Sequence, residues 1–273
     1  MTPWYRRPWR LVLLGVVVAL AIGAVAFAIA WSNRGADEVS TRDVVERFRE
    51  DNGNADGSGG FLRPPAGVYQ YRATGTERLS IASTEQQWGP TMPATVARRA
   101  DGCWSLRIEY STNHWQEQRY CPDQDSLLDV GGKVFQKFDF VTFAVTDTSV
   151  FTCHPPSAVI RVDASPGDSW AASCTGKSTE RDTQVTSAGT NTFVGVEDVD
   201  VDGETVRAFH YRLQRTLSGD QTGTEDTHDW YSATDGLLLR STRNTRVASP
   251  SPIGDVIYTE QGEFRLVSTQ PRR

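Results

Sequence analysis

Two histidines, His210 and His228, have the spacing that most directly suggests chemistry in this chain. Residue 219 lies midway between them, within the turn motif Ser218-Gly219-Asp220. Positions at equal distances from such a turn face each other across an antiparallel hairpin. With Asp226 and Asp229 close by, the two imidazoles could form a metal site or an acid–base pair. We favour the simpler interpretation of two polar residues on the solvent-facing side of a sheet, and we predict no metal.

The segment Asp198-Val199-Asp200-Val201-Asp202-Gly203 resembles the start of a calcium-binding loop. Such loops carry oxygen ligands at alternating positions, a glycine at the sixth position and a bidentate glutamate at the twelfth. The twelfth position here is Phe209, and no helical pattern flanks the segment. We therefore favour a β-hairpin that turns at Asp202-Gly203.

Motifs of the common hydrolases and nucleotide-binding proteins are missing from the sequence. It contains no GxSxG, HExxH, SxxK or Walker motif. We therefore predict no catalytic residue and no cofactor. An envelope hydrolase that uses two carboxylates is the third of our functional hypotheses, because such carboxylates need only meet in space.

The four cysteines, Cys103, Cys121, Cys153 and Cys174, allow three disulfide pairings. Two strands around a turn at Ser111–His114 would place Cys103 opposite Cys121. This predicts the pairs Cys103–Cys121 and Cys153–Cys174. The spacings contain no CxxC or HxxxH element, so zinc is disfavoured. Disulfides indicate an oxidising compartment outside the cytoplasm.

Aromatic residues in the expected strands are the remaining hint of a binding site. A curved sheet that is lined by aromatic rings can hold an apolar ligand. The alternative is an ordinary β core, since aromatic residues favour sheets. The candidate ligand-binding residues are Tyr69, Tyr71, Trp104, Phe138, Phe140 and Tyr211.

The elements that would position these residues are β-strands throughout residues 61–273. Segments with alternating polarity are separated by turn signals such as Asp101-Gly102, Gly131-Gly132 and Asp235-Gly236. No long helical pattern lies between them, so parallel βαβ units are not expected. The sequence predicts a mainly β fold with a curved antiparallel meander, shaped as a half-barrel or barrel, and a sandwich as the second choice.

The N-terminal part predicts a membrane anchor. Residues 11–31 carry no charge and would span roughly 30 Å as a helix. Arg6, Arg7 and Arg10 precede this span, which places the tail 1–10 in the cytoplasm and residues 61–273 outside it. A cleaved signal peptide is the alternative. The expected location is therefore the plasma membrane, with a single pass.

Residues 32–60 are expected to connect the span with the β domain. Ser40–Glu50 predicts a short helix, with Ser40 or Thr41 as the cap and an apolar stripe of Val44, Val45 and Phe48. The stripe could dock a partner or the membrane, but we favour a spacer helix. A flexible polar linker, Asp51–Gly60, follows.

The charge balance excludes one class of partner. The chain has 28 basic and 34 acidic residues and a formal net charge of −6. A surface of this sign is unsuited to nucleic acid, so none is predicted as a partner.

Several stretches carry a resemblance to known proteins. They are "DVVERFRE", "GVYQYRATGTE", "DGCWSLRIEY", "DWYSATDGLLLRS" and the C-terminal "SPIGDVIYTEQGEFRLVSTQPRR". Together with the arginine tail and the span, they resemble a group of single-pass envelope proteins of actinobacteria with no established activity. The stretch "DWYSATDGLLLRS" alone is also similar to half-barrel carriers of lipids and lipoproteins. The resemblance implies a membrane-anchored β domain in the cell envelope, and it implies no catalytic residue.

The leading hypothesis is thus a non-enzymatic, membrane-anchored extracytoplasmic protein. It would bind an apolar or lipid-like envelope ligand in the concavity of its sheet. The alternative is a protein–protein interaction module of the envelope with a solid core.

Overall fold

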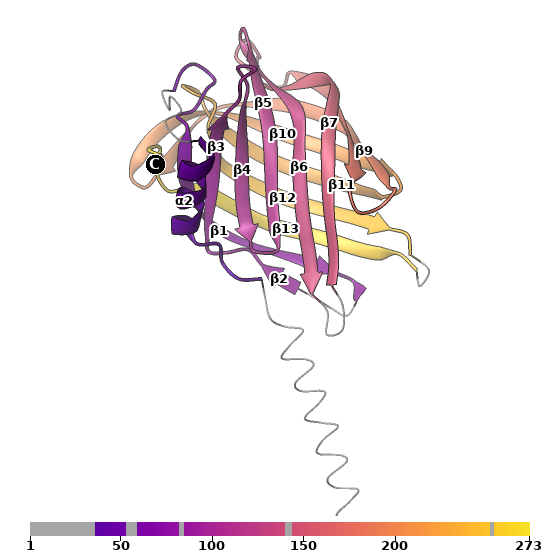
Figure 1. The fold of residues 1–273 in the computed structure, drawn as a ribbon. Helices are drawn as coiled ribbons and strands as arrows, with labels where there is room; N and C mark the ends of the chain where they lie inside the picture. Colours follow the sequence, from indigo (N-terminus) through magenta and orange to yellow (C-terminus); the bar gives the residue numbers. More distant parts are fainter. Residues whose placement is uncertain (1–35, 53–58, 82–84, 140–143, 252–253) are drawn as a thin grey trace, which may run out of the picture.

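The computed structural model describes residues 36–52, 59–81, 85–139, 144–251 and 254–273. In these ranges it contains one helix, α2 (Thr41–Asn52), and thirteen strands (Figure 1). The strands are β1 (Gly67–Leu79), β2 (Glu85–Gln87), β3 (Thr91–Arg98), β4 (Trp104–Ser111), β5 (His114–Asp123), β6 (Ser126–Asp139), β7 (Ala144–Arg161), β8 (Ser169–Ser178), β9 (Gln184–Val201), β10 (Glu204–Gly219), β11 (Thr222–Ser232), β12 (Leu238–Ser249) and β13 (Val256–Leu266).

The strands form one antiparallel sheet that closes on itself. Consecutive strands pair from β3 to β13, and β1 pairs with both β3 and β13. The short strand β2 only flanks β1, so twelve of the thirteen strands form the closed ring. The predicted antiparallel meander is confirmed, and its curvature continues to a full barrel rather than stopping at a half-barrel.

The tight turns predicted from sequence connect long hairpins. The β9–β10 hairpin turns at Asp202 and Gly203, which both have positive φ values of 52° and 90°. This is the backbone that a two-residue hairpin turn requires. The aspartates before the turn therefore belong to a strand.

Glycines allow neighbouring strands of the barrel to approach closely. An added Cβ at Gly189 on β9 would lie 1.9 Å from the backbone oxygen of Gln214 on β10. One at Gly132 on β6 would lie 2.0 Å from the backbone oxygen of Glu117 on β5. Both positions permit a close backbone approach that no side chain tolerates.

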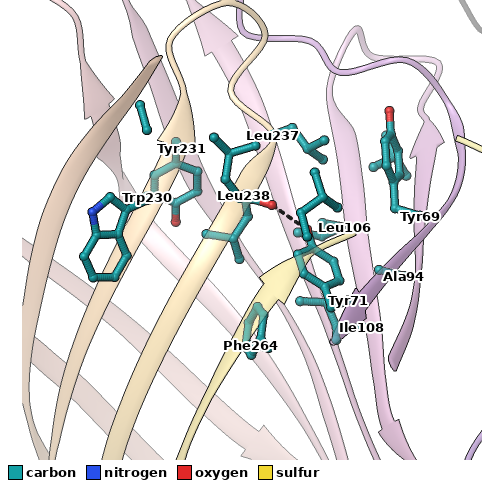
Figure 2. Packing of buried hydrophobic residues seen from close by; sticks show 14 of the residues in the cluster. Tyr69, Tyr71, Ala94, Leu106, Ile108, Trp230, Tyr231, Leu237, Leu238 and Phe264 are labelled. Atoms are coloured by element: carbon teal, nitrogen blue, oxygen red, sulfur yellow. Dashed lines mark hydrogen bonds between the residues drawn. The ribbon is translucent and has the colours of Figure 1, made fainter. Parts of the chain in front are cut away.

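One end of the barrel holds the main hydrophobic core (Figure 2). Because antiparallel neighbours alternate in direction, the starts of β1, β4 and β12 lie beside the ends of β5, β11 and β13. Large buried side chains from these strand ends, together with Tyr211 from the middle of β10, meet inside the wall and bury apolar area, the main stabilising contribution to such a fold. We call six of them the apolar plug: Tyr69, Tyr71, Trp104, Tyr211, Tyr231 and Leu238.

The helix α2 packs on the outside of the barrel and is not a free spacer. Its stripe of Val44, Val45 and Phe48 is buried against Ala66 and Val68 beside β1. At its start, the backbone N–H of Asp43 contacts the Ser40 hydroxyl at 3.5 Å, as expected for the cap. The spacer interpretation is therefore wrong, because the apolar stripe finds its partner on the same chain.

Two disulfides join neighbouring strands. Cys103 is bonded to Cys121 and Cys153 to Cys174. This is the pairing predicted from the hairpin positions.

The proposed span is not among the residues that the structure describes. Residues 11–31 and most of the polar linker, 53–58, lie outside the described ranges. Within the described ranges, no helix is long and apolar enough to cross a membrane.

Candidate functional site

The aromatic residues predicted to line a ligand site occupy two different places. Tyr69, Tyr71, Trp104 and Tyr211 belong to the apolar plug and are at most 1% exposed. Each donates its polar hydrogen to a backbone carbonyl, so their hydrogen bonds are made within the chain. They fill the closed end of the barrel and pack against one another.

The other two predicted residues lie apart from the plug. Phe138 is buried near the opposite end of the barrel, where its ring contacts the Tyr258 ring edge to face. Phe140 lies outside the described residues. Among the five candidate residues that the structure describes, four lie together in the plug and Phe138 lies apart from them.

Below the plug, the inner face of the barrel is polar. Arg243 on β12 donates a hydrogen bond of 2.6 Å to the side chain of Gln116 on β5, across the interior. Register places further charged residues on the same face, because Arg215, Glu225, Thr245 and Glu260 are cross-strand neighbours in turn. We call six of these side chains the polar belt: Gln116, Gln118, Arg215, Glu225, Arg243 and Glu260.

The polar belt keeps contact with solvent although it lies inside a closed wall. The Arg243 side chain is 18% exposed, and Gln116, Gln118, Arg215 and Glu225 are half-buried. Leu213 and Thr227, which adjoin Arg243 on the inner face, are also half-buried. Protein atoms therefore do not completely fill the interior beside the belt.

Burial and neighbouring charges both shift the pKa values of the charged residues in the belt. Burial raises the pKa of Glu225, while the nearby Arg215 guanidinium opposes this shift. Burial lowers the pKa of Arg215, and Glu225 again opposes. Burying a charge in a protein is unfavourable unless the charge is paired and hydrogen-bonded. Filling this interior with charged residues therefore contributes less to stability than filling it with apolar residues would.

Several polar atoms of the belt and its surroundings lack a partner. Among the described residues, Arg243 Nε, Glu260 Oε1, Asp229 Oδ1 and Ser241 Oγ are buried and make no close hydrogen bond, although Arg243 Nη1 lies 3.9 Å from Glu260 Oε1 and the Ser241 hydroxyl lowers the pKa of Asp229. They come from the neighbouring strands β11, β12 and β13 on the inner face. Buried polar atoms are nearly always paired in folded proteins, so the chain alone does not complete this network.

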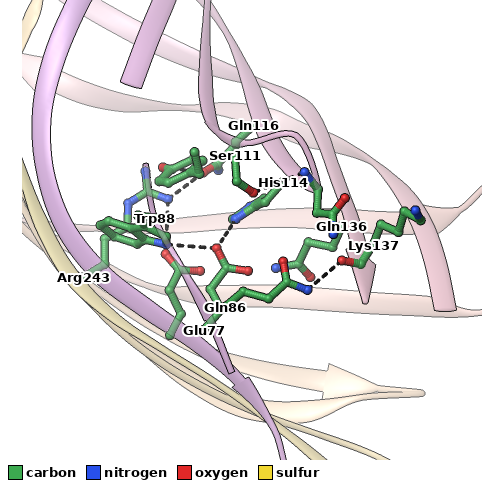
Figure 3. Close-up of polar contacts among 12 residues, drawn as sticks. Glu77, Gln86, Trp88, Ser111, His114, Gln116, Gln136, Lys137 and Arg243 are labelled. Atoms are coloured by element: carbon green, nitrogen blue, oxygen red, sulfur yellow. Dashed lines mark hydrogen bonds and ion pairs between the residues drawn. The ribbon is translucent and has the colours of Figure 1, made fainter. Parts of the chain in front are cut away.

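A second buried cluster adjoins the belt (Figure 3). The Glu77 carboxylate accepts a 2.9 Å hydrogen bond from the Trp88 indole and contacts His114 Nδ1 at 2.5 Å. The Tyr110 ring stacks on His114 with the ring centroids 4.4 Å apart. Burial lowers the pKa of His114, but the Glu77 carboxylate outweighs it, so the pKa lies above its usual 6.5.

One group of possible metal ligands lies inside the barrel. Asp129 lies beside Cys153 and Cys174. The two sulfurs are bonded to each other and offer no thiolate, and Asp129 accepts hydrogen bonds from Gln118 and the Gly131 backbone N–H. This group is therefore a poor fit for a metal ion.

The two histidines singled out from sequence do meet on the outer face of β10 and β11, but as diagonal neighbours, because the register pairs His210 with Trp230 and His228 with Arg212. His210 Nε2 lies 2.9 Å from His228 Nδ1, and His210 Nδ1 lies 2.8 Å from Glu197 Oε1. His210 is only 7% exposed. Burial and the neighbouring His210 lower the pKa of His228. They are thus one hydrogen-bonded unit, not two independent solvent-facing residues.

Sequence reasoning missed the polar belt. Its members alternate with outward-facing residues along β10 to β13, and such alternation normally indicates a polar outer face. The usable signal was that neighbouring positions are polar as well, as in Arg243-Asn244-Thr245. A strand that is polar on both faces predicts a hydrated interior.

Comparisons with known proteins give a distant likeness among solved structures. No protein-family model and no curated protein matches this chain. Among solved structures, it is similar to the hypothetical lipoprotein YmcC from Escherichia coli (K12), with a TM-score of 0.38 and 13% sequence identity. The match covers 86% of this chain and 100% of that chain. A likeness this distant supports no inference about ligand, activity or location.

Proposed function

We propose that the barrel binds an amphipathic ligand inside its wall, with the polar part of the ligand against the polar belt. The observation that carries this proposal is Arg243. It lies inside a closed barrel, bonds to the opposite wall and still keeps 18% of its side chain exposed. A residue used only for packing would not need a charge at this place.

The far end of the barrel supports a ligand with an apolar part. Val185, Leu217 and Val247 form a small apolar cluster there, with Phe151 and Tyr258 packed against it. A ligand that extends from the belt toward this end meets polar groups first and apolar groups next. Binding sites commonly combine apolar walls with a few convergent polar groups in this way.

The proposal replaces the aromatic lining expected from sequence with the polar belt. It keeps the expected class, an amphipathic or lipid-like molecule of the cell envelope. We further propose that residues 11–31 anchor the chain in the plasma membrane with the barrel on the outer side, as in the actinobacterial proteins that it resembles.

A protein-interaction module is the second candidate, and one observation favours it. A groove of about 380 Å³ lies on the outer surface between α2 and the barrel, lined by Arg47, Arg99, Glu117 and other residues. It offers charges of both signs to a partner. The envelope hydrolase has no such support among the described residues.

A pair of tryptophan substitutions on β10 tests the ligand proposal. Leu213 faces the interior beside Arg243, whereas its neighbour Gln214 is exposed on the outer face. Leu213→Trp fills space beside the belt without removing a charge, and Gln214→Trp adds the same bulk outside. The full chain is purified from actinobacterial membranes and weighed by native mass spectrometry.

We expect a co-purifying small-molecule mass with the natural chain and with Gln214→Trp, and its loss with Leu213→Trp. Circular dichroism would confirm that both variants fold. A natural chain that carries no bound mass, or a mass that persists in Leu213→Trp, would contradict the proposal.

A further inference from the structure

The outer face of β10 and β11 carries a preorganised pair of imidazoles. Because the Glu197 carboxylate only accepts hydrogen bonds, the proton of neutral His210 is on Nδ1. Its Nε2 therefore presents a lone pair toward His228 Nδ1 at 2.9 Å. Two ring nitrogens that converge in this way share one proton.

The surroundings hold His210 in one orientation. Its ring stacks on Trp230 with the centroids 4.1 Å apart and an angle of 17° between the planes. The Trp230 indole donates to the second oxygen of Glu197 at 2.8 Å, so one carboxylate fixes both rings. Metal-binding histidines almost always donate their other ring N–H to a carboxylate or carbonyl, as His210 does here.

We propose that His210 and His228 bind a divalent transition-metal ion of the copper(II) type, which takes the place of the shared proton. Two nitrogens in adjacent positions of a square-planar ion, each about 2.0 Å from the metal, lie about 2.8–2.9 Å apart. The observed 2.9 Å matches this arrangement. Imidazole nitrogens suit copper(II), which binds such ligands most tightly among the divalent first-row ions.

Water completes the coordination. His228 is half-buried, so its side of the site is open to solvent and its ring can turn toward the ion. Asp226, a second acid on this face besides Glu197, has both oxygens bonded to Arg212 at 2.9 and 2.6 Å. The ligand set is therefore two imidazole nitrogens plus water, with Glu197 as the positioning residue.

The test is electron paramagnetic resonance of the full chain with one equivalent of copper(II), together with an affinity measured by competition with glycine. We expect a tetragonal signal that shows coupling to two nitrogens. His210→Ala and His228→Gln should each weaken binding at least tenfold. His154→Ala, a change of another exposed histidine, should leave the affinity unchanged.

The Glu197→Gln variant distinguishes a positioning role of Glu197 in metal binding from a purely structural role. It should keep the two-nitrogen signal while the affinity falls about 10- to 100-fold, the usual effect of losing an orienting carboxylate. Copper binding that is unaffected by His210→Ala and His228→Gln would overturn the proposal. So would a natural chain that leaves copper(II) entirely with the competitor, because the pair would then hold a proton only.

Discussion

Among single residues, the Glu77–His114 pair shows best how this interior tolerates charge. Both side chains are only 3% exposed, and each is the other's closest ionic partner. The Trp88 indole adds a second donor to the same carboxylate. Removing one member of such a pair leaves the other charge buried without compensation, which costs about 3–5 kcal/mol.

The raised pKa of His114 predicts a pH-dependent stability. A group whose pKa is higher in the folded chain stabilises fully below its unfolded value of about 6.5, and this contribution is lost as the pH rises through the folded value. We expect His114→Gln to reduce the free energy of unfolding most near pH 6 and less toward pH 9. Urea denaturation across this range measures it.

The matched control for this measurement is His154→Gln, since His154 is exposed. It should follow the natural chain at every pH. A His114→Gln effect that grows with rising pH would contradict the ion-pair account.

Residue pairs close to one turn could be predicted from the sequence, and pairs across the interior could not. Cys103 with Cys121, and His210 with His228, are each related by a single hairpin whose turn is visible. Arg243 and Gln116 are 127 positions apart, and their contact depends on closure of the whole sheet. The belt therefore could not be seen in a strand-by-strand reading.

At the scale of elements, close contacts between neighbouring strands constrain which residues the barrel wall accepts. The strands β9 and β10 approach so closely at Gly189 that the site has no room for a Cβ. Alternation of polarity reveals that a strand exists, but it does not reveal where the strand bends. The helix α2 was predictable from its cap and stripe, although its docking on Ala66 and Val68 was not.

The close approach of β9 and β10 at Gly189 predicts that a larger residue there lowers stability. Gly189→Ala places a methyl group against the Gln214 backbone oxygen, so we expect a cost of about 1–3 kcal/mol or more. Gly60→Ala is the control, because nothing lies within 4 Å of a Cβ added there. Thermal unfolding of both variants measures the difference. Equal melting temperatures of the two variants would contradict a close contact between the strands at Gly189.

At the scale of the whole molecule, the pairing of β1 with β13 closes a curved meander into a barrel. Nothing in the local pattern of either strand requires this pairing, which joins residues such as Tyr71 and Leu266 at opposite ends of the chain. The sequence predicted curvature and antiparallel order, but closure depends on how bends accumulate over twelve strands. The closed wall places a plug, a polar belt and a small apolar cluster in succession along one interior.

The central claim is that this interior holds a ligand at the polar belt. A high-resolution crystal structure of the full chain, expressed in an actinobacterial host and purified without exchange into other lipids, tests it most directly. We predict density for a non-protein molecule within hydrogen-bond distance of Arg243 or Glu260, extending toward Val247 and Tyr258. An interior that contains only ordered water, bonded to the unpartnered atoms of the belt, would contradict the claim.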